Sequence, residues 1–228
     1  MYVPEFFRES RLDVLHALMS DNPFATLITL AGGQPSIDHL PLLLRPDGGH
    51  GTLAGHVARA NPVWQALAGG PATVVFHGPA AYVSPSWYPA KARHHKVVPT
   101  WNYAVVHAEG TIRAVEDAHW LLELVRELTD RHEAAHGAAH GAAHGAAHGA
   151  AHETPWRVAD APADFVATMI GQIVGIELSI TRLTGKWKLS QNRSAEDVAG
   201  VIHGLRVRGL GSDVELAELM TRQGTRSA

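Results

Sequence analysis

Residues 186–194, KWKLSQNRS, gather cationic, aromatic and hydrogen-bonding side chains within one short stretch. Two lysines flank Trp187, and hydroxyl, amide and guanidinium groups follow it. Such a set can hold an anionic ligand that also presents ring edges or hydroxyl groups. The side chains that can supply these contacts are Lys186, Lys188, Ser190, Gln191, Asn192 and Arg193.

A second stretch, residues 81–110, offers similar chemistry with more aromatic rings. Its prolines preset the backbone, and its basic run at 91–96 stands out in an otherwise acidic chain. The wide aromatic faces belong to Trp87, Tyr88, Trp101 and Tyr103, and short polar groups come from Ser84, Ser86, Thr100 and Asn102. Together they favour a planar anionic cofactor or nucleotide. The alternative is that the rings are core residues and the basic run is a solvated loop.

A third stretch, LAGHVARANPVWQAL at 53–67, has the composition of a phosphate site. His56 is followed by Arg59 and Asn61, and Pro62 can begin a helix whose first backbone N–H groups attract anions. His56 alone could equally be a core histidine. Because distant strands become neighbours in a barrel, the three stretches can converge on one ligand.

Composition limits the possible classes of protein. The chain of 228 residues is 46% hydrophobic and 18% charged, which is typical of a globular protein with a buried core. A net charge of −3 gives no overall attraction to nucleic acid or to an anionic membrane. The absence of cysteine excludes disulfides and thiolate metal sites. We find no secretory signal and no apolar run of ~18 residues, so we expect a cytoplasmic protein without membrane contact.

Hydrophobic patterning predicts a mainly β chain of α+β class. Helical spacing covers residues 9–20, the region from Asp117 to 132 and residues 162–170. Residues 194–228 form a C-terminal helical segment, in which Ser194 is a plausible N-cap and Asp213 opens a last helix. Short strands separated by turns are predicted at 24–30, 35–45, 50–57, 72–78, 101–115 and 175–185. Their regular spacing favours one antiparallel barrel domain, 1–228, with peripheral helices.

Residues 134–153 read AAHG four times and then AAHE. A histidine every four residues could hold a divalent metal if the tract were helical. However, each repeat glycine costs about 1 kcal/mol in a helix interior, and the tract has no hydrophobic face. We interpret it as a low-complexity insertion in a loop between two helices, where divalent metal binds only adventitiously.

Seven motifs spread along the chain can be compared with known families. They are MYVPEFFRE, NPFATLIT, HLPLLL, GHVARANPVW, AYVSPSWYP, VPTWNYAVVHAEG and GKWKLSQNRSAED. Together they resemble the PaiB family of FMN-binding negative transcriptional regulators. The resemblance covers most of the chain outside the repeat. It implies a split β-barrel of FMN-binding type, with FMN as the cofactor, in a homodimer whose flavin lies near the subunit interface.

The resemblance also implies residue roles. Phosphate contacts would fall on His56, Arg59 and Asn61. Ring and ribityl contacts would fall on Ser84, Ser86, Trp87, Thr100, Trp101 and Asn102, with Lys188, Ser190, Gln191 and Asn192 closing the pocket.

Two functions remain open at this point. The resemblance implies a regulator that binds promoter DNA, although the sequence has no helix-turn-helix or zinc-finger signature. Its basic candidates for DNA contact are the 91–96 run and the arginines at 206, 208, 222 and 226. The alternative is an FMN-dependent oxidoreductase of the pyridoxamine-phosphate-oxidase, flavin-reductase or haem-oxygenase-like class, in which flavin carries hydride or electrons. No catalytic residue is singled out among His39, His107 and Tyr88.

Overall fold

The computed structural model describes residues 1–143 and 154–224. The chain forms two compact units whose segments alternate along the sequence. The first unit contains Met1–Thr26, Thr73–Glu109 and Thr181–Ala228, and the second contains Leu27–Ala72 and Gly110–Ile180. The single domain expected from the sequence stays a prediction.

The strands of the described residues pair into one eight-stranded sheet. They are β1 (Arg8–Glu9), β2 (Phe24–Ala31), β3 (Gln34–Pro41), β4 (Leu43–Arg45), β5 (Thr52–Ala58), β6 (Ala68–Val83), β7 (Thr100–Val115) and β8 (Ile173–Lys188). Their order is β3-β2-β6-β7-β8-β5-β4, and β1 pairs antiparallel with β8. The long strands β6, β7 and β8 each run from one unit into the other.

The helices begin close to the periodic segments of the sequence, except for a short helix at residues 90–94 that was not predicted. They are α1 (Leu12–Asp21), α2 (Ala90–His94), α3 (Ala118–Ala143), α4 (Ala163–Gly171), α5 (Ala195–Arg208) and α6 (Asp213–Gly224), with short 3₁₀ turns η1 (Glu5–Phe7), η2 (Pro62–Ala66), η3 (Pro85–Trp87) and η4 (Val158–Asp160). Ser194 caps α5 as predicted, because its Oγ accepts a hydrogen bond from the backbone N–H of Asp197 at 3.2 Å.

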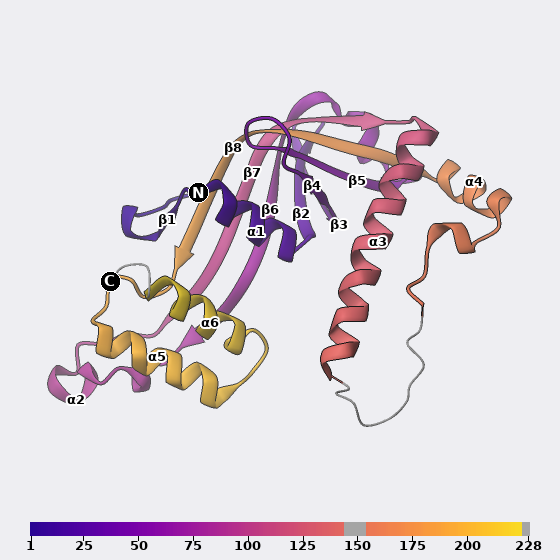
Figure 1. Ribbon diagram of the computed structural model, residues 1–228. Coiled ribbons are helices and arrows are strands. Elements are labelled where there is room, and N and C mark those ends of the chain that lie inside the picture. The colour runs from indigo at the N-terminus through magenta and orange to yellow at the C-terminus, as the bar shows by residue number, and fades with distance from the viewer. Residues whose placement is uncertain (144–153, 225–228) are drawn as a thin grey trace. The chain divides into compact units, whose positions relative to one another are not determined.

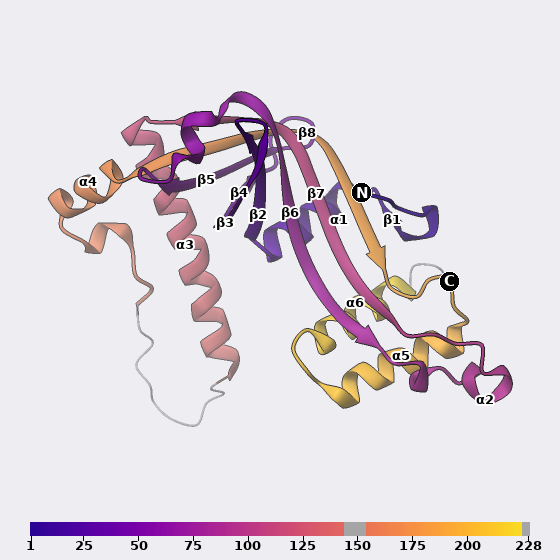
Figure 2. The same cartoon turned by 180° about the vertical axis from the view of Figure 1, so that it is seen from behind.

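In the first unit, helices α1, α5 and α6 bury apolar side chains. Helix α1 buries Leu15, Leu18 and Met19. Gly185 of β8 allows this packing, because a Cβ there would lie 2.3 Å from Cδ2 of Leu15. Helices α5 and α6 lie side by side in both views (Figures 1 and 2), and their shared interior includes Leu205.

In the second unit, helix α3 covers strands β4 and β5. Leu124 and Leu128 pack on Leu43 and Ala54, with Trp120 at the edge of this cluster. These contacts bury the apolar stripe of α3, which is the usual source of helix stability in a protein.

Helix α3 continues to Ala143 (Figure 1), so residues 134–143 of the repeat are helical rather than part of a loop. Extending an existing helix needs no new nucleus, and the alanine pairs offset the cost of the glycines. Residues 144–153 lie outside the described residues, as do the histidine side chains of the repeat. Adventitious metal binding there stays a prediction.

Candidate functional site

In the first unit, Lys188 joins two of the sequence stretches. Its Nζ atom donates hydrogen bonds to Oγ1 of Thr100 and to the backbone oxygen of Trp101, the latter at 2.8 Å. Lys188 ends β8 and Thr100 begins β7, and these strands are neighbours in the sheet. The structure therefore brings together three of the predicted contacts.

Two aromatic rings near these contacts are open to solvent. Trp101 is 56% exposed and Tyr82 is 39% exposed. Their ring centroids lie 6.3 Å apart in an edge-to-face arrangement. Two neighbouring exposed rings beside a hydrogen-bonded lysine offer an apolar surface that a flat ligand can cover.

The electrostatics of Lys188 differ from those of a freely solvated lysine. Burial lowers the pKa of its ammonium group, and the positive charge of Lys186 acts in the same direction, while Tyr103 opposes the shift. A partly desolvated ammonium interacts more strongly with an anion than a solvated one does. We call Tyr82, Thr100, Trp101 and Lys188 the lysine–tryptophan cluster.

Other predicted contacts are engaged within the protein. Asn102 and Ser190 are both buried, and Nδ2 of Asn102 lies 2.9 Å from Oγ of Ser190. The Gln191 amide closes the turn after β8, since it donates to the Trp187 carbonyl and accepts from the Leu189 N–H. These three side chains fix the end of β8. Asn192 is exposed on the same turn.

Trp87 anchors the C-terminal helices. Its ring lies so close to α5 that a Cβ at Gly204 would come within 2.3 Å of it. The Arg208 guanidinium lies 4.9 Å from the ring centroid. Beside it, Ser84 caps η3 by accepting from the N–H of Ser86 at 3.2 Å. Flavin contact by Trp87, Ser84 and Ser86 stays a prediction, whereas their structural contacts are clear.

The predicted phosphate residues lie in the second unit. Arg59 donates to Oε2 of Glu116 at 2.7 Å and to the backbone oxygens of Gly171 and Ile173 at 2.9 and 3.2 Å. These bonds already use its charge and most of its donors. Asn61 donates to Asp38 at 2.7 Å and accepts from the N–H of Val63, which makes it the cap of η2.

His56 differs from these two neighbours in one respect. Its Nδ1 atom is buried and has no hydrogen-bond partner among the described residues. Burial lowers the pKa of this imidazole, which favours its neutral form. A buried polar atom without a partner is the kind that a ligand satisfies. Convergence of His56 with the lysine–tryptophan cluster stays a prediction.

Comparison with known proteins identifies the family. Residues 1–182 match the family described as "Putative FMN-binding domain". The chain belongs to this family. One relative is protease synthase and sporulation protein PAI 2 from Bacillus subtilis, which is 30% identical over 96% of both chains. An uncharacterized protein from Emericella nidulans is 31% identical over 98% of both chains.

Solved structures confirm the fold of this FMN-binding-domain chain. The flavocytochrome Anf3 from Azotobacter vinelandii aligns with a TM-score of 0.57 at 14% identity, covering 87% of this chain and 78% of that one. A FAD and heme binding protein from Mycobacterium smegmatis aligns with a TM-score of 0.55 at 18% identity, covering 84% and 78%. The predicted α+β, mainly β, split barrel of flavin-binding type is therefore confirmed.

The lysine–tryptophan cluster fits the cofactor that the family name specifies. FMN combines a flat ring with hydroxyl groups and a phosphate, and the cluster supplies two open rings, a hydroxyl and a cation. Tyr82 was missed by the sequence reasoning. Strand alternation in β6 could have indicated it, because Ala81 and Val83 on either side of Tyr82 are buried and a strand turns successive side chains to opposite faces.

None of the described helices is long and apolar enough to cross a membrane.

Proposed function

We propose that this chain binds FMN and acts as a flavin-dependent negative regulator of transcription. The observation that carries the FMN half is the family match over residues 1–182, together with a lysine–tryptophan cluster of suitable chemistry. The regulatory half is supported by the relative from Bacillus subtilis, whose name refers to protease synthase and sporulation.

In this proposal the lysine–tryptophan cluster contacts the flavin directly. The open faces of Trp101 and Tyr82 would stack on or flank the ring system, and Lys188 would place a positive charge against an anionic part of the molecule. Bound FMN supplies hydride and single-electron chemistry. The protein's own task is to hold the ring and to keep Lys188 oriented through Thr100 and the Trp101 carbonyl.

Trp101→Ala and Lys188→Met should each weaken FMN binding about tenfold. Loss of one stacking ring costs about 1–3 kcal/mol, and loss of a charged hydrogen-bond donor costs a similar amount. Titration of FMN, followed by quenching of its fluorescence, measures the affinity. Lys96→Met removes an exposed lysine of the same unit and serves as the control. FMN affinities equal to wild type in both test variants would remove the cluster from the flavin site.

The surface available for DNA is narrower than the sequence suggested. Arg208 pairs with Asp213 at 2.6 Å, and Arg93 pairs with Glu196 at 2.7 Å. Arg222 lies 4.0 Å from Glu218. The other basic side chains of residues 91–96, around α2, are exposed, and we propose them as the DNA contact.

A gel shift and a reduction assay together test the regulatory half. We expect the FMN-loaded protein to shift promoter DNA but not a random duplex, with an affinity that falls as salt rises. If there is no sequence-specific shift and the yellow protein bleaches with catalytic turnover of NADH or NADPH, the FMN-dependent oxidoreductase is the better assignment.

We also propose a homodimer, as the resemblance implies, and a location in the cytoplasm. Light scattering during size-exclusion chromatography of the FMN-loaded protein measures the oligomeric state. A monomer at micromolar concentration would contradict the dimer.

A further inference from the structure

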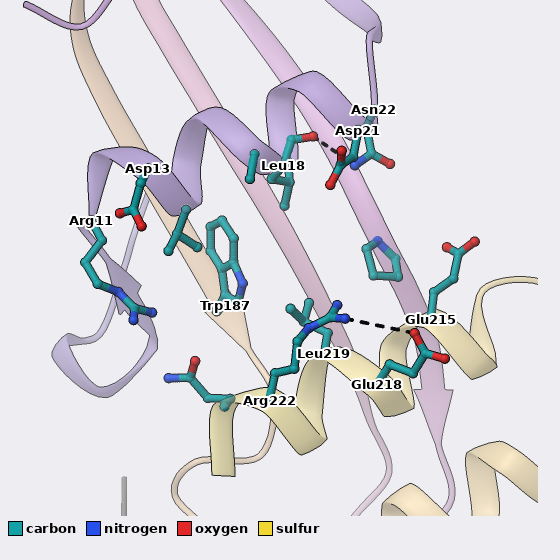
Figure 3. A pocket seen from close by; sticks show the side chains of 14 residues that line it. Arg11, Asp13, Leu18, Asp21, Asn22, Trp187, Glu215, Glu218, Leu219 and Arg222 are labelled. Atoms are coloured by element: carbon teal, nitrogen blue, oxygen red, sulfur yellow. Dashed lines mark hydrogen bonds and ion pairs between the residues drawn. The ribbon is translucent and has the colours of Figure 1, made fainter. Parts of the chain in front are cut away.

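The first unit contains a pocket between helices α1 and α6 (Figure 3). Its volume is about 570 Å³, which lies within the usual range for sites of small organic molecules. One wall is formed by α1 and the other by α6, and Trp187 of β8 lies between them. Pro79 of β6 also lines the pocket.

Carboxylates outnumber cations around this pocket. Asp13 and Asp21 come from α1, and Glu215 and Glu218 come from α6. Two arginines also line it, but each is engaged. Arg11 donates to the buried carboxylate of Glu9 at 2.9 Å through Nε, and Arg222 lies 4.0 Å from Glu218. The surplus of negative charge favours a ligand that carries a positive charge.

Apolar side chains also line the pocket. Val14, Ala17 and Leu18 line it from α1, and Leu219 lines it from α6. The Trp187 ring between them is only 3% exposed. Aliphatic carbon placed here would leave water, so a purely polar or hydrated ion is a poor match for the site.

Trp187 also presents its indole N–H toward this space. None of the hydrogen bonds among the described residues starts from its Nε1 atom, although the Trp187 carbonyl accepts one from Gln191. Figure 3 shows the nitrogen edge of the indole facing the side of the pocket where Leu219 and Arg222 lie. The Nε1 atom is not one of the fully buried polar atoms that lack a partner among the described residues. Water can therefore reach it from the pocket, and a ligand oxygen can take the place of that water.

We propose that this pocket binds a small aliphatic molecule that carries both an ammonium group and a carbonyl oxygen, as an α-amino amide does. The ammonium group faces the carboxylates of Asp21 and Glu215, the carbonyl oxygen accepts from the Trp187 indole, and the aliphatic part lies on Leu18 and Leu219. Trp187 and Lys188 are consecutive on β8, so their side chains point to opposite faces. The pocket is therefore distinct from the lysine–tryptophan cluster and does not depend on the proposed FMN site.

Three matched compounds test the chemistry by isothermal titration of the purified full-length protein. L-leucinamide has all three features, isocaproamide lacks only the ammonium group, and isoamylamine lacks only the amide. We expect saturable binding of L-leucinamide and binding at least about fivefold weaker for each of the other two. If L-leucinamide does not bind, or if either analogue binds equally well, the proposal is wrong.

Protein variants place the site in the structure. We expect the double variant Asp21→Asn with Glu215→Gln to bind L-leucinamide about fivefold or more weakly, because it removes the two charges that face the ammonium group. Both carboxylates are exposed on helix surfaces, so the variant should fold like wild type. Glu123→Gln changes an exposed carboxylate of α3 and should bind like wild type. Equal loss in the control variant, or no loss in the double variant, would overturn the assignment.

Trp187→Phe tests the indole N–H while it keeps an aromatic ring. We expect about fivefold weaker binding of L-leucinamide and an unchanged affinity for isoamylamine, which has no carbonyl oxygen. Weakening of both compounds to the same extent would argue against the hydrogen bond. If this variant does not fold, the double carboxylate variant still decides the proposal.

Discussion

Asp213→Asn should lower the free energy of unfolding by about 3 kcal/mol at neutral pH. The Asp213 side chain is 2% exposed, and it accepts from Nε and Nη2 of Arg208 at 2.7 and 2.6 Å and from the backbone N–H of Leu210 at 2.9 Å. Asparagine can still accept from Leu210, but it leaves the Arg208 guanidinium without its counter-charge. Urea denaturation followed by circular dichroism measures the change.

The effect of Asp213→Asn should depend on pH in a defined direction. The hydrogen bonds from Arg208, and secondarily that from Leu210, hold the pKa of Asp213 below its usual value, although burial opposes them. A carboxyl whose pKa is lower in the folded state stabilises the protein above its unfolded pKa, and this stability is lost as the pH falls through the folded pKa. The difference between wild type and variant should therefore shrink in acid.

Asp164→Asn is the matched control for this experiment. Asp164 also lies in the first turn of a helix, α4, but its side chain is exposed. We expect a change below about 0.5 kcal/mol, as for most surface substitutions. A loss of stability in Asp213→Asn that matches the control, or that does not vary with pH, would show that the Arg208 pair is not a stabilising contact.

Gly204→Ala should destabilise the protein by about 1–3 kcal/mol, the usual cost of overpacking. The added Cβ would lie 2.3 to 2.5 Å from three atoms of the Trp87 ring. Either the ring or helix α5 must move, although alanine is intrinsically the better helix former. Thermal denaturation followed by circular dichroism tests the expectation, and a shift in Trp fluorescence would report movement of the ring.

The same variant separates the two roles of Trp87. If Trp87 only anchors α5, Gly204→Ala changes stability and leaves FMN affinity at the wild-type value. If the ring also contacts flavin, both measurements change together. Gly171→Ala, at the end of α4 where nothing lies within 4 Å of the added Cβ, is the control and should not be destabilised. A stable Gly204→Ala variant would contradict the close packing.

Much of the fold could be predicted from local sequence signals. Ser194 marks the beginning of α5, because its short polar side chain accepts from a free N–H of the first turn. Asp213 is the first residue of α6, and its carboxylate accepts from the N–H of Leu210, which lies before the helix. Strand β7 was predicted to within one residue of its observed bounds, since buried and more exposed positions alternate along part of it. The end of α3 was predicted wrongly, because the glycines of the repeat indicated a loop. The repeat instead extends a helix that Leu124 and Leu128 already anchor.

The candidate site was harder to predict than the fold. Residue type indicated that Lys188, Thr100 and Trp101 belong together, and their hydrogen bonds agree with that hypothesis. Type alone could not show that Arg59 is already bound to Glu116, or that Asn102 and Ser190 satisfy one another in the interior. Such pairing depends on which strands become neighbours. The α1–α6 pocket was missed for the same reason.

The pairing of β1 with β8 has a consequence for synthesis on the ribosome. Arg8 and Glu9 meet Lys186 and Gly185, so β1 finds its partner only after residues 10–186 have been translated. Until then a nascent chain exposes an unpaired strand edge, which favours chaperone capture or misassembly. The β1–β8 pairing of the first unit therefore forms slowly and late, because its two strands are far apart in the sequence.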